Sequence, residues 1–360
     1  MSFFLRSKKP MSRRLAVIPG EPIADYLRVG HDPDRLRGYY NPGGFFDEVF
    51  LLSPLEEDRD DLLGMRVYKT RDRQLRGAIK RLGIDVVRAY GGYWPCAMAC
   101  DYKRRGVPVV VSVHDTNPDL LFPAIRKADY VWCVSSVVRD QVLGLFPHPD
   151  RVWLLPNRVC LDTMRPYAGP LTDPLLRRYP FRYRIVHVGR KVSQKNLDTV
   201  IRALSLLGDD YGLIAIGRGE VESYRSLAED LGVGQRCFFL EAVENRDLPA
   251  YYSLPGCFCV PSRWEGFGVV FIEAMACGAV VVTSDIAPMN EFIRHQDNGL
   301  LVRDYERPGA LAEMIRSACE QEDLRERIQQ RAPDSVRPFA RQRVDALEAE
   351  YYRRVLDHRC

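Results

Sequence analysis

The chain has 360 residues, of which 46% are hydrophobic and 28% charged, and its formal net charge is +4 at pH 7. This length exceeds one ordinary hydrophobic core and predicts two domains of about 150 to 200 residues each. The small net charge argues against a dedicated nucleic-acid binder. It is compatible with an anionic ligand or with a weak contact to a membrane surface.

The cysteine pattern bears on the cellular compartment. Ten cysteines are spread along the chain, mostly inside apolar runs, and no CxxC pair occurs. This pattern favours buried reduced thiols in a cytoplasmic protein over a zinc site or a disulfide framework. No apolar stretch reaches about 18 residues, so we expect neither a transmembrane helix nor a secretory signal. The basic stretch LRSKKPMSRR (5–14) favours a disordered lead-in. The alternative for it is a peripheral contact at the inner membrane face.

Short β-branched runs alternate with helix-length patterns through the first half of the chain. The runs expected to form strands are 15–19, 48–53, 84–90, 107–114, 130–135 and 151–157. From residue 84 onward these runs are almost continuously apolar, as in parallel strands covered on both faces. We therefore expect a Rossmann-like N-terminal domain over residues 1–160.

The alternation lapses between about 158 and 182, where four prolines occur, and we expect an interdomain linker over residues 161–182. Strands are then expected at 184–189, 211–217, 236–243, 257–262, 279–284 and 299–303. They predict a second Rossmann-like domain over residues 183–333. A solvated amphipathic helix is expected over residues 334–360, crossing back to the N-terminal domain. The predicted fold class is therefore α/β, with two doubly wound sheets facing each other across a cleft.

The stretch EGFGVVFIE (265–273) places two carboxylates around the start of an expected helix. A helix that begins near Gly268 presents free amides and the positive end of its dipole, which attract phosphate. Gly266 lets the backbone approach a ligand closely. Glu265 is a good acceptor for sugar hydroxyls and Glu273 for a ribose diol, so a nucleoside diphosphate-sugar fits the whole pattern. The alternative is that Glu265 caps the helix and Glu273 is exposed.

Polar residues follow two other expected strands. Arg190 and Lys195 lie in the loop after the strand at 184–189, where two cations can neutralise a departing diphosphate. Ordinary salt bridges on a solvated loop are the alternative. His114 ends the strand at 107–114, where it can contact a sugar or stabilise charge; a structural histidine is the alternative.

Other motifs are less specific. The turn IGRGE (216–220) lacks the full GxGxxG spacing, which disfavours a nicotinamide-dependent dehydrogenase but allows a tight turn near a nucleotide. Two DxD strings, at 32–34 and 58–60, have the residue types that hold a metal in some nucleotide-sugar enzymes. The first lies in a turn and the second in a charge run, so we expect no metal site.

Taken together, these motifs resemble the retaining glycosyltransferases of family 4, which have the two-domain GT-B fold. EGFGVVFIEAMACG resembles the E-x7-E motif of that family, and VGR with Lys195 five positions later resembles its diphosphate-binding pair. The segments VSVHD and LLPN are also similar to the family pattern. The resemblance implies transfer of a sugar, most often from a UDP-sugar, to an acceptor hydroxyl with retention of configuration. It implies no cofactor and no metal.

The resemblance also implies a role for each matching residue. Arg190 and Lys195 would stabilise the leaving diphosphate, and Glu265 and His114 would contact the transferred sugar. The remaining residues would bind the donor through the ribose (Glu273), the base (backbone near Val243) and the phosphates (backbone at Gly20, Gly266, Phe267, Gly268 and Val269). The N-terminal domain would take the acceptor, which is a sugar, a lipid-linked glycan or a small molecule. No nucleic-acid partner is implied.

Two departures and two alternatives accompany this resemblance. The first N-terminal loop reads IPGEP, with Gly20 alone where many members have a glycine pair, and Arg158 stands where many have glycine. The alternatives are a nucleotide-sugar epimerase on the same fold, and a catalytically silent module that binds sugars or partners. Epimerases need acid–base groups around C2 of the sugar, which the set of Arg190, Lys195 and the two acids fits less well than sugar transfer. A silent module would tolerate loss of Lys195 or Glu265, yet this chain has both.

Overall fold

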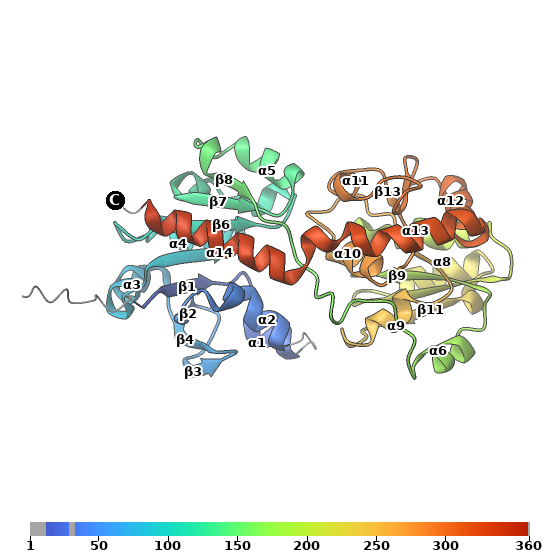
Figure 1. Ribbon diagram of the computed structural model, residues 1–360, viewed down its shortest axis with the longest axis horizontal. Coiled ribbons are helices and arrows are strands. Elements are labelled where there is room, and N and C mark those ends of the chain that lie inside the picture. Colours follow the sequence, from blue (N-terminus) through green and yellow to red (C-terminus); the bar gives the residue numbers. More distant parts are fainter. Residues whose placement is uncertain (1–11, 29–32, 359–360) are drawn as a thin grey trace, which may run out of the picture. The chain divides into compact units, whose positions relative to one another are not determined.

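The computed structural model describes residues 12–28 and 33–358 (Figure 1). Most of the basic segment 5–14, and Asp32 of the first DxD string, lie outside the described residues. Contacts divide the chain into two compact units. Among the described residues, unit 1 comprises those up to Val134, Val138–Leu155 and those from Asp345 onward, whereas unit 2 comprises Ser135–Val137 and Pro156–Val344.

Unit 1 is built on an eight-stranded sheet in the order β3-β4-β2-β1-β5-β6-β7-β8. Among the described residues, every neighbouring pair is parallel except β3 with β4. The strands are β1 (Arg14–Ile18), β2 (Glu48–Ser53), β3 (Arg59–Leu62), β4 (Met65–Lys69), β5 (Val86–Tyr90), β6 (Val109–Val113), β7 (Tyr130–Cys133) and β8 (Val152–Leu154). Since β1 pairs with both β2 and β5, the direction of strand addition reverses between β1 and β5.

Helices connect the strands of unit 1 as expected for parallel neighbours. They are α1 (Ile23–Arg28), α2 (Pro33–Tyr40), α3 (Leu75–Leu82), α4 (Trp94–Asp101) and α5 (Ser136–Leu143), whose first two residues belong to unit 2. A further helix, α14 (Arg341–Asp357), follows all the strands, and its first four residues belong to unit 2. The amphipathic helix α3 buries Leu75 and Ile79 and ends where Gly83 adopts the left-handed conformation.

Helix α14 is anchored to the unit 1 sheet by a buried charge. Arg88 of β5 donates from Nη1 to Glu348 Oε1 at 2.6 Å and to the Tyr352 hydroxyl at 2.9 Å. The Arg88 and Glu348 side chains are 2% and 0% exposed. The Arg88 guanidinium also lies 4.1 Å from the centre of the Trp132 ring. The helix is amphipathic as expected and exposes Arg353 and Arg354, but it is not simply a solvated closing helix, because its inner face carries a carboxylate that pairs with a buried arginine.

Unit 2 is built on a six-stranded, all-parallel sheet in the order β11-β10-β9-β12-β13-β14. The strands are β9 (Tyr183–Val188), β10 (Tyr211–Ile216), β11 (Cys237–Leu240), β12 (Gly256–Val260), β13 (Val281–Ser284) and β14 (Leu300–Val302). The helices are α6 (Thr172–Arg178), α7 (Leu197–Leu204), α8 (Glu222–Asp230), α9 (Leu248–Tyr252), α10 (Val269–Ala276), α11 (Met289–Phe292), α12 (Pro308–Glu320) and α13 (Glu322–Ser335). The predicted α/β class with two doubly wound sheets is confirmed.

Three local expectations differ from the structure. The charge run around residues 58–60 forms the edge strand β3, whose Arg59, Asp60 and Asp61 are exposed. The expected linker 161–182 contains the helix α6. The C-terminal helix expected from residue 334 begins only at Arg341, because α13 continues to Ser335 and a 3₁₀ turn that contains Pro338 follows it.

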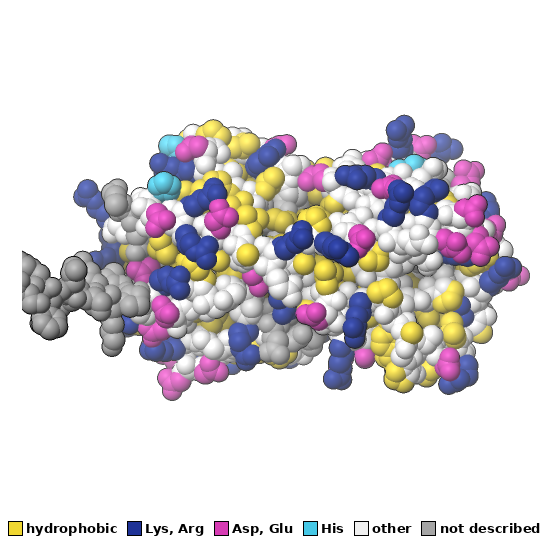
Figure 2. All heavy atoms as spheres, viewed as in Figure 1, with side chains coloured by type: hydrophobic (Ala, Val, Ile, Leu, Met, Phe, Trp, Pro, Cys, Tyr) yellow, Lys and Arg dark blue, Asp and Glu magenta, His cyan; other side chains and the backbone are white. Residues whose placement is uncertain are grey.

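The burial of the cysteines and the distribution of surface charge agree with what the composition predicts. Nine cysteines of the described chain are free thiols, and eight of them are buried. On the face drawn in Figure 2, cationic and anionic side chains are interspersed over both units. In the described chain, no helix combines the length and the apolar character needed to cross a membrane.

The buried histidine of β9 predicts how stability depends on pH. His187 is fully buried, and its Nδ1 lies 2.9 Å from Cys259 O. Burial, helped by the nearby ammonium groups of Lys195 and Lys191, lowers the pKa of His187 from 6.5 to about 3. The unfolded chain therefore binds one more proton than the native protein between these values. We expect the free energy of unfolding to fall by about 1.4 kcal/mol between pH 7.5 and pH 5.5 from this residue alone.

Urea denaturation of the wild type and of His187→Asn at both pH values measures this contribution. The asparagine amide can still donate to Cys259 O but does not titrate. The pH-dependent loss of stability should therefore be about 1.4 kcal/mol smaller in the variant than in the wild type. Equal pH dependence in both proteins would contradict the assignment.

Candidate functional site

The polar loops of unit 2 gather at one edge of its sheet. The loops after β9, β10, β11 and β12 all leave from the carboxyl ends of parallel strands, which lie at the same edge. The direction of strand addition reverses between β9 and β12, and ligands of doubly wound sheets bind at such a switch point. Arg190 and Lys195 follow β9, and Glu265 follows β12. Three predicted residues therefore flank this position.

Lys195 and Glu265 form an ion pair across the two loops. Lys195 Nζ donates to Glu265 Oε1, and the two side chains are 12% and 6% exposed. The Ser262 hydroxyl donates to the same carboxylate oxygen at 2.8 Å. Glu265 therefore does not cap helix α10, whose N-cap is Gly268. Sequence reasoning singled out both charged residues but not their mutual contact, nor the contribution of Ser262.

Arg190 provides a second cation beside this pair. It directly follows Gly189 at the carboxyl end of β9, and its side chain is exposed. In the described part of the chain, the Arg190 side chain makes no hydrogen bond or ion pair, whereas its carbonyl oxygen accepts from the Val192 amide at 2.9 Å. Of the two predicted cations at this edge, Lys195 is thus paired with a carboxylate and Arg190 is available.

The first turn of helix α10 is suited to an anion. Gly268 has φ +82°, and a Cβ at this position would lie 2.4 Å from the ring of Phe271, so glycine is required. Among the described residues, the amides of residues 267–270 donate to no protein acceptor, because the first amides of a helix have no partner within it. The helix dipole adds partial positive charge at the same place. The predicted phosphate-binding residues Gly266, Phe267, Gly268 and Val269 lie here.

Glu273 lies on α10 and is 5% exposed. The Tyr252 hydroxyl is 3.5 Å from Glu273 Oε2. The alternative in which Glu273 is merely an exposed helical residue is therefore excluded. Burial of a carboxylate destabilises the folded protein unless hydrogen-bond donors satisfy it. The position of Glu273 therefore indicates a role beyond helix propensity.

The loop after β10 packs against the loop after β9. Gly217 has φ +141°, and a Cβ there would lie 1.9 Å from Gly189 O. Lys191, which sequence reasoning missed, is 3% exposed and donates from Nζ to Leu240 O at 2.7 Å and to Gly217 O. Burial lowers the pKa of Lys191 below its ordinary value. The IGRGE turn (216–220) thus packs against the loop that carries Arg190 and Lys195, and Lys191 bonds that loop to the end of β11.

Val243 lies in the loop that follows β11 and is half-buried. This loop is next to the carbonyl groups that Lys191 holds, at Gly217 and Leu240. The structure thus places the predicted base-binding segment at the same sheet edge as the two cations.

The two predicted residues of unit 1 lie at the carboxyl edge of its own sheet. Gly20 follows β1, and a Cβ at Gly20 would lie 2.2 Å from the Tyr93 hydroxyl and 3.1 Å from Tyr90 O, so a larger residue would have to displace the Tyr93 side chain. The Trp94 indole donates to Gly20 O at 3.0 Å. His114 follows β6, and its ring stacks on Tyr90 with centroids 6.2 Å apart. Tight aromatic packing therefore surrounds the switch point between β1 and β5.

The described residues contain no group of three or more His, Cys, Asp and Glu side chains that could hold a metal ion. In the second DxD string, Asp58 accepts the Lys69 amide at 2.6 Å, and Asp60 lies on the edge strand β3. These carboxylates are part of the β3–β4 hairpin.

Comparisons with known proteins identify the family of the chain. Residues 177–335 match the family model described as glycosyl transferases group 1, and residues 57–163 match glycosyltransferase family 4. An uncharacterized glycosyltransferase of Methanocaldococcus jannaschii is 32% identical over 306 residues, which cover 77% of this chain and 76% of that protein. The chain belongs to the family 4 glycosyltransferases.

Two further relatives of this family 4 chain have assigned names. One is the GDP-mannose-dependent alpha-(1-6)-phosphatidylinositol monomannoside mannosyltransferase of Mycobacterium tuberculosis, 32% identical over 187 residues and matched over 48% of each chain. The other is the D-inositol 3-phosphate glycosyltransferase of Xylanimonas cellulosilytica, 28% identical over 56% of this chain and 51% of its own length. The chain thus spans about half the length of these curated relatives.

Solved structures show that the fold is GT-B. Sucrose-phosphate synthase from Thermosynechococcus elongatus has a TM-score of 0.78 at 18% identity, covering 96% of this chain and 99% of its own. The Anabaena protein HepE in complex with UDP-glucose has a TM-score of 0.76 at 17% identity, covering 95% and 99% of the two chains. At these identities the likeness concerns the fold alone.

Proposed function

We propose that this chain is a retaining glycosyltransferase that moves a sugar from a nucleoside diphosphate-sugar to an acceptor hydroxyl. The observation that carries the proposal is the Lys195–Glu265 ion pair at the switch point of the unit 2 sheet. A cation, an acid and an unpaired helix terminus meet the needs of a diphosphate and a sugar together. A purely structural loop has no need for this combination.

The donor would be held by groups with complementary chemistry. The amides of residues 267–270 and Arg190 would bind the diphosphate, Glu273 the ribose and the backbone near Val243 the base. A bound diphosphate competes with Glu265 for Lys195, and the released carboxylate can then accept hydrogen bonds from the transferred sugar. His114 and Gly20 are proposed contacts of the sugar and the donor phosphate.

The reaction would be a front-face displacement. The bond from sugar C1 to the phosphate oxygen breaks, and a bond from C1 to the acceptor oxygen forms on the same face. The acceptor hydroxyl gives its proton to an oxygen of the leaving phosphate, so the products are the glycoside and a nucleoside diphosphate. Lys195 and Arg190 stabilise the charge that grows on the leaving group, which is the task of a metal ion in other transferases. We therefore propose that no metal is needed.

The names of similar proteins narrow the proposed substrates. One relative is GDP-mannose-dependent, and one solved neighbour is in complex with UDP-glucose. Two relatives are named for acceptors that contain inositol and phosphate. We propose a UDP- or GDP-sugar as the donor and a phosphorylated polyol, free or lipid-linked, as the acceptor.

A transfer assay tests the proposal. The protein is incubated with UDP-glucose, GDP-mannose or ADP-glucose, with inositol 3-phosphate or phosphatidylinositol, and with or without a chelator. We expect release of nucleoside diphosphate together with an α-linked product, unaffected by the chelator. Altered sugar stereochemistry without nucleotide release would favour the epimerase. Activity that is lost with the chelator and restored by Mg²⁺ would overturn metal independence.

Glu273→Gln should weaken donor binding. Loss of the carboxylate charge removes a charge-assisted hydrogen bond to the ribose, a contact that contributes about 1.5–3 kcal/mol. We therefore expect the Kd of the preferred donor, measured by titration calorimetry, to rise at least about 10-fold. The control is Glu229→Gln, at an exposed position of α8, which should leave the Kd unchanged. Unchanged affinity in both variants would exclude Glu273 from the donor site.

A further inference from the structure

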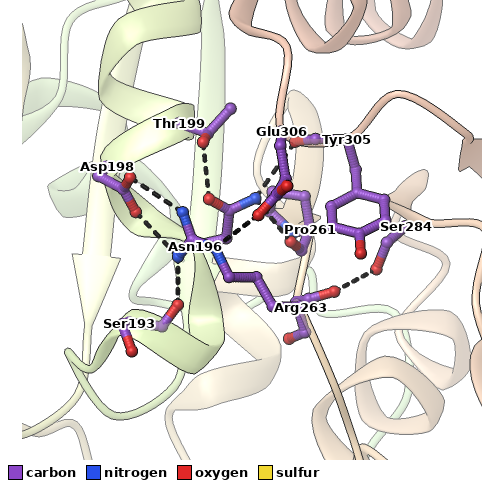
Figure 3. Close-up of polar contacts among 10 residues, drawn as sticks. Ser193, Asn196, Asp198, Thr199, Pro261, Arg263, Ser284, Tyr305 and Glu306 are labelled. Carbon is purple, nitrogen blue, oxygen red and sulfur yellow. Dashed lines mark hydrogen bonds and ion pairs between the residues drawn. The ribbon is translucent and has the colours of Figure 1, made fainter.

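The loop that carries Lys195 and the loop that carries Glu265 are joined by Arg263 (Figure 3). The Arg263 guanidinium donates to Ser193 O, to both oxygens of Asp198 at 3.1 and 3.3 Å, and to Glu306 Oε1 at 2.9 Å. One side chain thereby links the turn before Lys195, the first turn of α7 and the loop after β14. Its charge is matched by two carboxylates.

The backbones of the two loops are also bonded directly. The amide of Arg263 donates to Gln194 O at 2.8 Å, and the Gln194 side chain donates to Trp264 O at 2.8 Å. Residues immediately before Lys195 are therefore tied to residues immediately before Glu265. Only a few covalent bonds separate these hydrogen bonds from the side chains of Lys195 and Glu265. The hydrogen bonds therefore restrict the relative position of the two charged side chains.

Asn196 fixes the other side of Lys195. It is fully buried and has φ +57°, a left-handed conformation that asparagine tolerates better than most residues. Its amide donates to Pro261 O at 3.0 Å and to Tyr305 O at 3.2 Å, and its carbonyl oxygen accepts from Thr199 at 2.6 Å (Figure 3). Lys195 thus lies between two anchored residues.

We infer that Arg263 is a positioning residue that holds Lys195 against Glu265. Among the described residues, the hydrogen bonds and ion pairs of its side chain go to the supporting segments named above, so it acts through Lys195 and Glu265. Misplacement of a catalytic group by about 1 Å can lower the rate about 100-fold. An effect of Arg263 on turnover therefore rests on the proposed function, in which Lys195 and Glu265 act on the substrate. The simpler alternative is that Arg263 forms an ordinary surface ion pair. Such pairs contribute little to stability and need have no role in a functional site.

Chemical labelling of Lys195 tests this inference without any substrate. An ammonium group paired with a carboxylate in a fixed loop reacts slowly with an amine-acylating reagent. We expect Arg263→Ala to raise the acylation rate of Lys195 at least fivefold, measured by mass spectrometry and normalised to the exposed Lys80. Arg263→Lys, which keeps the charge but not the branched geometry, should give a smaller rise.

A matched control separates positioning from the loss of any ion pair. Arg303 pairs with Asp285 at 3.6 Å, and its side chain is 91% exposed. Arg303→Ala should leave the labelling of Lys195 unchanged. If Arg263→Ala does not fold, Asp198→Asn, which removes one charge that orients Arg263, should raise the labelling at least twofold. Wild-type labelling in folded Arg263→Ala or Asp198→Asn would overturn the inference.

Kinetic data distinguish failure of this inference from failure of the proposed function. If the wild type transfers sugar, Arg263→Ala should lower kcat more than it raises the KM of the donor. Faster labelling in a protein that transfers no sugar would support the positioning role and reject the transferase. A lower kcat with unchanged labelling would reject the positioning role.

Discussion

Replacing Lys195 by alanine is expected to lower kcat by about 100- to 1000-fold, the effect of removing one preorganised donor to a developing negative charge. Lys195 is the less exposed of the two cations at the switch point, and its pairing with Glu265 keeps it in place. Its charge matters most as the diphosphate leaves, so the donor Kd should change much less than kcat. Steady-state kinetics with titration calorimetry separates the two quantities.

A second paired lysine provides the control for this prediction. Lys127 pairs with Asp101 at 2.6 Å on the surface of unit 1, with its side chain 61% exposed. Lys127→Ala should leave both kcat and the donor Kd at wild-type values. If kcat is also unchanged in Lys195→Ala, this lysine has no part in the chemical step.

The largest expected effect on stability concerns Arg88. Arg88→Met removes the guanidinium that pairs with the buried Glu348 carboxylate, and breaking a buried pair in this way costs about 3–5 kcal/mol. Arg88 also donates to the hydroxyl groups of Ser112 and Tyr352, so the substitution removes these buried hydrogen bonds as well. The free energy of unfolding of unit 1, measured by urea denaturation, should fall by this amount.

A double variant tests whether the cost arises from the buried Glu348 carboxylate that has lost Arg88. Arg88→Met with Glu348→Leu removes both charges, and apolar replacements of buried pairs are often neutral or stabilising. We expect the double variant to recover most of the stability that the single variant loses. A double variant as unstable as Arg88→Met alone would point to packing against Trp132 as the main contribution.

The unit 2 strands were predictable from sequence because parallel strands covered on both faces read as apolar runs. All six residues of β10 are buried, for example. The edge strand β3 was missed because its exposed residues are charged, as is common for edge strands. The partner of Glu348 was not predictable either, since Arg88 lies 260 positions away and its strand context reads as ordinary.

The candidate site was predictable in its residue types but not in its internal contacts. Glycines and acids at helical spacing identify 265–273, and a cation after a strand identifies Lys195. The ion pair between Lys195 and Glu265 depends instead on how two loops cross, which is governed by Asn196 in a left-handed conformation and by Arg263. Such contacts depend on tertiary structure, so no local sequence pattern predicts them. Lys191 reads in sequence as another loop cation, although its side chain is buried.

Thermal melting of the protein with UDP-, GDP- and ADP-sugars tests the central claim most directly. A ligand at about 100 times its Kd adds roughly 2.7 kcal/mol to the stability of the unit that binds it. We predict a rise in Tm with the sugars of one nucleotide, and a much smaller rise in Glu273→Gln. No rise with any donor, or an equal rise in Glu273→Gln, would contradict a donor site at the carboxyl edge of the unit 2 sheet.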